Sequence, residues 1–209
     1  MGKIKKKLFS WDKKYIWPPK GGMSEEETVQ KYADFSKDIC DPGKMLQTID
    51  DILVWGKTYR RKNVEERQAA ALRFKEALSC VINAEYDFDH LCVEDIIRIT
   101  KGQRLSSWTK ILAAYKPGIF FIYDSRVAAA LNICTGTNTW LNPASQHPVK
   151  KMSECYYNYL QQLKKWAAAY KDDYLRDDFR EIREAYNAAG FDENQAIMAH
   201  LEKMLFMMK

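Results

Sequence analysis

Two residues with reactive side chains lie in one short stretch of the sequence, SSWTKILAAYKPGIFFIYDSRVAAALN, which runs from Ser106 to Asn132. Lys110 precedes Asp124 by 14 residues. A lysine near apolar side chains loses hydration, which lowers its pKa and makes it a candidate amine nucleophile. A carboxylate at a helix N-terminus is stabilised as an anion, so it can face a developing positive charge. The pair therefore predicts chemistry that passes through a cation.

Each of these residues also has a purely structural interpretation. Asp124 opens an alanine-rich segment, so its side chain can accept from the amides of Arg126 or Val127 as a helix cap worth about 1 kcal/mol. Lys110 can equally be a surface lysine on an amphipathic helix. On spacing alone both interpretations stay open.

The elements that must position the two residues are helices. Apolar residues recur at helical spacing almost throughout, and Ser24 with Glu27 forms a capping-box start. Only residues 119–123 read as extended, after a stop at Lys116-Pro117-Gly118. The sequence predicts an all-α fold, with helices over about 24–37, 45–59, 64–84, 93–100, 106–115, 124–133, 151–170, 173–189 and 192–207.

The length, composition and net charge of the chain fit a globular domain of ordinary composition. The chain has 209 residues, of which 46% are hydrophobic and 29% charged, and its net charge is +5. We expect a basic irregular segment over 1–23 and a single all-α domain over 24–209. No apolar run is long enough for a membrane span or a secretory signal, so we expect a cytoplasmic protein. The five cysteines show no metal-binding spacing, and we expect no metal and no cofactor.

The connection between the helices over 93–100 and 106–115 is a candidate phosphate site. It contains Gly102, with Lys101 and Arg104 on either side, and the next helix opens at Ser106. Amides at a helix N-terminus bind phosphate well, although the same pattern also fits an ordinary connection between helices. Arg126 is a further phosphate candidate, with an internal salt bridge as its alternative.

The motif P-x-x-F-x-I-x-D-x-R-V, after a helix, a glycine hairpin and a second helix, resembles the helix-hairpin-helix DNA glycosylase superfamily. The similarity covers about residues 93–132 and is nearest to the 8-oxoguanine DNA glycosylase-like branch. It implies a two-lobed helical fold with the active-site cleft between the lobes. It also implies that Asp124 is the catalytic carboxylate and that Lys110 matches the lysine of members with lyase activity.

Two departures bear on the lysine. The hairpin reads Thr100-Lys101-Gly102-Gln103-Arg104 where the family usually has a sequence like L-P-G-V-G, and the lysine-to-aspartate interval is shorter. Lys101, Arg104 or Ser106 is therefore an alternative occupant of the lysine's place.

The resemblance implies an enzyme that flips a damaged or modified base out of double-stranded DNA and cleaves its N-glycosidic bond. The family's usual target is oxidised guanine in repair, and the divergent hairpin together with the unmatched loop around Trp140 keeps open a bulky modified base of phage DNA in antiviral defence. Attack by Lys110 leads to strand nicking, whereas attack by water leaves only an abasic site. We expect a monomer.

Aromatic residues should build the base pocket or wedge into the duplex. The candidates are Trp55, Trp108, Tyr123 and Trp140, and each has the alternative role of a core or lid residue. Two other functions remain open: a non-catalytic DNA-binding helical module, and an all-α partner-binding protein that uses the methionine-rich last helix, residues 196–208.

Overall fold

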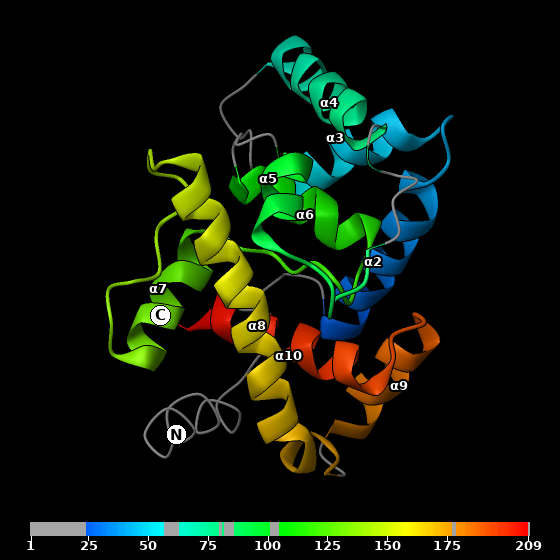
Figure 1. Cartoon of the computed structure of the whole chain (residues 1–209). Helices are drawn as coiled ribbons and strands as arrows, with labels where there is room; N and C mark the ends of the chain where they lie inside the picture. Colours follow the sequence, from blue (N-terminus) through cyan, green and yellow to red (C-terminus); the bar gives the residue numbers. More distant parts are fainter. Residues whose placement is uncertain are drawn as a thin grey trace.

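The computed structural model describes residues 24–56, 63–79, 81, 86–100, 105–176 and 179–208. Within these ranges its regular structure is helical, which confirms the all-α prediction (Figure 1). The helices are α2 (Glu25–Ile39), α3 (Met45–Trp55), α4 (Val64–Ser79), α5 (Val93–Thr100), α6 (Leu105–Tyr115), α7 (Ser125–Thr135), α8 (Val149–Tyr174), α9 (Arg180–Ala188) and α10 (Glu193–Met207).

Local capping signals set several helix ends. Ser24 forms the predicted capping box with Glu27 at the start of α2. Asp192 forms a second box with Gln195 at the start of α10, and both boxes satisfy amides that the first helical turn leaves open. Gly136 ends α7 in the left-handed conformation, with φ of 68°, which a residue without Cβ adopts at little cost.

Two predicted boundaries differ from the structure. The helix expected over 45–59 ends at Trp55, where Gly56 serves as the C-cap. The break expected after Tyr170 is absent, because α8 continues to Tyr174. Tyr170 and Tyr174 are both fully buried one turn apart. Their packing in the core keeps residues 171–173 helical, although all three are charged. The predicted segment 1–23 lies outside the described residues.

The packing places α6 and α10 at the centre of the molecule. α6 packs on α2 and α3, while α10 packs on α7, α8 and α9. The long helix α8 crosses the face seen in Figure 1, with α7 and α10 beside it. A large hydrophobic cluster draws residues from all of these helices, and a smaller one joins Tyr32, Ala113 and Ile122.

The segment between α6 and α7 forms no regular strand. It contains one isolated bridge, between Pro117 and Phe120. Gly118 has φ of 90°, and a Cβ there would lie 2.5 Å from the side chain of Gln195. This glycine therefore turns the chain tightly against α10, after which residues 119–123 lead directly into α7.

Candidate functional site

Asp124 is the N-cap of α7, as the sequence predicts. Its Oδ1 accepts from the amides of Arg126 at 2.9 Å and Val127 at 3.1 Å. Both bonds end on the same oxygen, so Oδ2 has no hydrogen-bond partner among the described residues. The carboxylate is half-buried, and the helix amides hold one of its oxygens in place.

Lys110 is a buried lysine on α6, with only 6% of its surface exposed. Its Nζ donates to the carbonyl of Ser106 at 3.1 Å and approaches Ser106 Oγ at 3.3 Å. Its aliphatic stem packs against Gly56, where an added Cβ would lie 2.4 Å from Lys110 Cδ. The surface-lysine interpretation is therefore wrong for Lys110.

The charge of Lys110 is coupled to Asp124. Burial lowers the pKa of Lys110, as the sequence predicts, while the carboxylates of Asp124 and Glu202 oppose that decrease. Lys110 and Asp124 form no ion pair with each other in the structure. The amine therefore lies within the field of the carboxylate without being neutralised by direct contact.

Side chains from neighbouring helices hold the segment that carries Asp124. Thr109 Oγ1 of α6 accepts from the amide of Tyr123 at 3.1 Å and lies 3.3 Å from its carbonyl oxygen. Tyr156 of α8 donates its hydroxyl to the carbonyl of Phe121 at 2.9 Å. These bonds replace the ladder that a strand would have, so the position of Asp124 depends on α6 and α8.

A second carboxylate, Glu202 of α10, completes this set of bonds. Its Oε1 accepts from the amide of Ile122 at 3.2 Å, and only 5% of the residue is exposed. Burial raises the pKa of Glu202 to about 7, against the opposing effects of Lys203, the Ile122 amide and Lys110. Glu202 therefore changes charge near neutral pH, and its charge interacts with both predicted catalytic residues, Asp124 and Lys110.

Lys203 lies next to Glu202 and is also buried. Its Nζ donates to the hydroxyl of Tyr186 at 2.8 Å and lies 5.2 Å from the ring centres of Tyr32 and Tyr186. A cavity of about 10 Å³ opens beside Tyr32, Phe121, Glu202 and Lys203. This volume is close to the minimum for a single water molecule, so a base cannot enter without movement of the surrounding side chains.

Sequence reasoning missed Glu202 and Lys203. The methionine-rich pattern of the last helix predicted an apolar face, and the two charged residues interrupt that pattern between Leu201 and Met204. That interruption was the available signal, because a charged pair on the buried stripe of a helix requires partners in the interior. The fully buried hydroxyl of Tyr159 is another missed feature, since it has no hydrogen-bond partner among the described residues.

Two of the predicted pocket aromatics belong to the core. Trp108 is 2% exposed and packs edge-on against Phe74, with ring centres 5.0 Å apart. Tyr123 is fully buried and donates its hydroxyl to the carbonyl of Leu141 at 2.8 Å. Trp55 is half-buried and packs edge-on against Tyr32, with ring centres 5.4 Å apart. Tyr32 in turn lines the small cavity beside Glu202.

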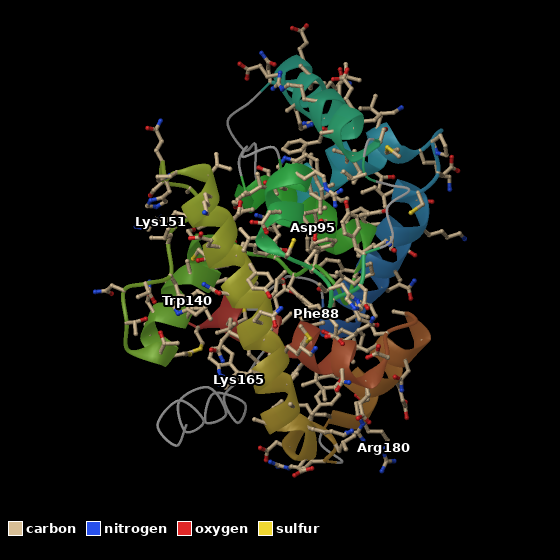
Figure 2. The ribbon with its side chains drawn as sticks, in the orientation of Figure 1. Phe88, Asp95, Trp140, Lys151, Lys165 and Arg180 are labelled. Carbon is tan, nitrogen blue, oxygen red and sulfur yellow. The ribbon has the colours of Figure 1, made fainter. Side chains whose placement is uncertain are left out.

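Trp140 lies in a different place, on the flank of α8. Its indole nitrogen donates to Thr135 at 3.2 Å, and its backbone is bound by the side chain of Asn132. It lines an open groove of about 500 Å³ together with Lys151 and Lys165 of α8 (Figure 2). Neither Lys110 nor Asp124 lines this groove.

Most of the predicted phosphate contacts are not part of the described structure. Lys101, Gly102 and Arg104 lie outside the described residues. Ser106 is half-buried, and its backbone carbonyl binds Lys110. Arg126 is exposed and stacks its guanidinium over Phe206, 4.6 Å from the ring centre, so it forms a cation–π contact in place of the salt bridge considered from the sequence.

The described residues contain no group of three or more histidine, cysteine or acidic side chains arranged to hold a metal ion. No helix in the same ranges has the length and apolar character to cross a membrane. Comparison of the chain with protein-family models, with curated proteins and with solved structures gave no match.

Proposed function

We propose that this protein is a DNA N-glycosylase with Asp124 as its catalytic carboxylate and Lys110 as its amine nucleophile. The observation that carries the proposal is a buried lysine with a lowered pKa in the field of a half-buried carboxylate, one oxygen of which has no hydrogen-bond partner among the described residues. Neither the burial of the amine nor the unbound oxygen is needed to cap a helix.

The carboxylate suits the charge that this reaction develops. When the bond between base and sugar breaks, the base leaves with the bonding electron pair and the sugar becomes an oxocarbenium-like cation. An anion fixed in advance by the helix amides stabilises that cation without reorganisation during the reaction. In this proposal Oδ2 of Asp124 faces the sugar, while Oδ1 keeps its hydrogen bonds from the amides of Arg126 and Val127.

The amine suits attack on the sugar. Only a neutral amine is a nucleophile, and burial increases the neutral fraction of Lys110 near neutral pH by lowering its pKa. Its nitrogen forms a bond to C1′ as the base departs, and loss of a proton with opening of the sugar ring gives a Schiff base. Subsequent β-elimination would nick the strand. If Lys110 does not reach C1′, water attacks and an abasic site is the product.

The order of elements supports the same proposal. Helices α5 and α6 precede the segment that carries Asp124, and α7 begins at that residue, as in helix-hairpin-helix glycosylases. A two-lobed arrangement with a cleft at this site belongs to the proposal, as does the target: oxidised guanine or a bulky modified base of phage DNA. Neither Lys110 nor Asp124 lines the small cavity beside Glu202, so entry of a flipped base requires side chains around Asp124 to move.

A base-release assay tests the proposal. The protein is incubated with oxidised duplex DNA and with phage DNA rich in modified bases, and free bases are measured by mass spectrometry. Asp124→Asn retains an oxygen that can cap α7 but lacks the charge. The matched control is Asp192→Asn, which makes the same change at the N-cap of α10.

We expect base release by the wild type and by Asp192→Asn, and its loss in Asp124→Asn. If all three proteins release no base yet bind duplex DNA equally, a non-catalytic DNA-binding helical module replaces the enzyme. That second candidate rests on the two cap bonds of Asp124, which are sufficient for a structural role.

A further inference from the structure

Glu202 differs from every other carboxylate of the described chain in its surroundings. It is buried in the centre of the molecule, and the residue that it binds, Ile122, is 80 positions away in the sequence. The amide of Ile122 is two residues before Asp124. A group on α10 therefore holds the backbone that delivers the carboxylate proposed to act on the sugar.

Charged and titratable groups surround Glu202 from each helix that packs around it. Lys203 on α10 and Lys110 on α6 stabilise its anion, whereas Asp124 at the start of α7 disfavours it. Tyrosines of α2 and α8 face it as well, and burial together with the charge of Glu202 raises the pKa of each; they are Tyr32, Tyr156 and Tyr159. Within the described ranges the hydroxyl of Tyr159 has no hydrogen-bond partner, so an unsatisfied donor lies in the interior around Glu202.

We propose that Glu202 is a positioning residue with two tasks. Its carboxylate holds the segment that carries Asp124 through the bond to the Ile122 amide, and its charge acts on the amine of Lys110, which is buried as deeply as Glu202 itself. For its second task the inference rests on the proposed function, because the proton on Lys110 matters only if the amine attacks.

The sign of the second task follows from electrostatics. An ionised Glu202 stabilises the ammonium form of Lys110 and so delays its deprotonation as the pH rises. Removal of that negative charge allows Lys110 to become a neutral amine at a lower pH. If Glu202 had a purely structural role, its substitution would change the amount of active protein at every pH and leave the midpoint of the Lys110 titration unchanged.

Two substitutions separate the tasks. Glu202→Gln keeps an oxygen that can accept from the Ile122 amide but carries no charge. Glu202→Asp keeps the charge but is one methylene shorter, which draws it back from that amide. Glu193→Gln, in the first turn of the same helix and paired with Lys171 on the surface, is the matched control.

The first measurement is an NMR titration of the Lys110 side chain in protein with ¹³C-labelled lysine, with its signal assigned by its absence in Lys110→Met. We expect the midpoint to fall by about one pH unit in Glu202→Gln, as for charges that interact across a protein interior. It stays unchanged in Glu193→Gln. An unchanged midpoint in Glu202→Gln overturns the electrostatic task.

Hydrogen exchange at the Ile122 amide tests the other task. We expect protection to be kept in Glu202→Gln and to fall at least tenfold in Glu202→Asp, because only the shorter side chain releases the amide. Equal protection in both variants overturns this task.

Borohydride trapping of the proteins on an abasic duplex then connects the inference to the proposed function. We expect the pH at which trapping becomes half-maximal to fall in Glu202→Gln together with the NMR midpoint. If the NMR midpoint falls but no protein is trapped, the electrostatic task stands and Lys110 is not the nucleophile. If trapping becomes weaker at every pH and neither midpoint moves, Glu202 has only a structural role.

Discussion

Substitution of Glu202 by glutamine should change how the stability of the protein depends on pH. Burial raises the pKa of this carboxyl from 4.5 to about 7 in the folded state. A raised pKa means that the folded protein holds the proton more tightly than the unfolded chain does. The protonated Glu202 therefore makes its full contribution to the free energy of unfolding below pH 4.5, and this contribution is lost as the pH rises through about 7.

The size of the effect follows from the same two values. The difference between 4.5 and about 7 corresponds to about 3 kcal/mol at 1.36 kcal/mol per pH unit. Glutamine cannot ionise, so Glu202→Gln avoids this loss. Relative to the wild type, the variant should gain about 2–3 kcal/mol in free energy of unfolding between pH 5 and pH 8.

Urea denaturation of both proteins at pH 5 and pH 8 measures this quantity, with the free energy extrapolated to water at each pH. We compare the free energies of unfolding of the two proteins at each pH. The titration of all other groups is the same in both proteins and cancels in the difference. Glu193→Gln, on the surface of the same helix, should show no such change with pH. If the difference between Glu202→Gln and the wild type is the same at pH 5 and pH 8, Glu202 is not a buried acid with a raised pKa.

Two further predictions concern neighbours of this site. Tyr159→Phe removes a buried hydroxyl that has no partner in the part of the chain that the structure describes, and it should leave the free energy of unfolding unchanged or raise it by about 1 kcal/mol. Tyr156→Phe removes the donor to the Phe121 carbonyl and should lower that free energy by about 1 kcal/mol. Thermal denaturation compares the two variants, and equal losses in both would contradict the assignment. Gly56→Ala places a Cβ against the stem of Lys110, which can swing away, so we expect near-normal stability but at least tenfold weaker borohydride trapping. Undiminished trapping in Gly56→Ala would show that the position of the amine is not set by this contact.

The local parts of the site could be predicted from the sequence. An aspartate before an alanine-rich run identifies an N-cap, because the bonds that make a cap lie within three residues. The lowered pKa of Lys110 was expected from the apolar residues around it in the sequence, but its burial also depends on Gly56 at the end of α3, which lies far away in the chain. Only the cap of Asp124 depends on contacts between residues close in the chain, which patterns of residue type describe well.

The contribution of α10 could not be predicted in the same way. Glu202 acquires its role through one bond to Ile122, and no local pattern indicates which amide a distant carboxylate will reach. For the aromatics the difficulty is burial: Trp108 and Trp140 were both pocket candidates, yet Trp108 packs on Phe74 in the core and Trp140 lines a groove. The hairpin residues Lys101, Gly102 and Arg104 lie outside the described residues, and their role stays a prediction.

The side-chain bonds to residues 121–123 have a consequence for the order in which the molecule assembles. Their partners are 14, 35 and 80 positions away along the chain, on α6, α8 and α10. Contacts over such separations form slowly, because the entropy of closing the intervening loop opposes them. The cap of α7 can therefore form before the three side-chain bonds to residues 121–123 fix the position of Asp124. That position would then be set only as α10 docks, later than the helical content that circular dichroism reports.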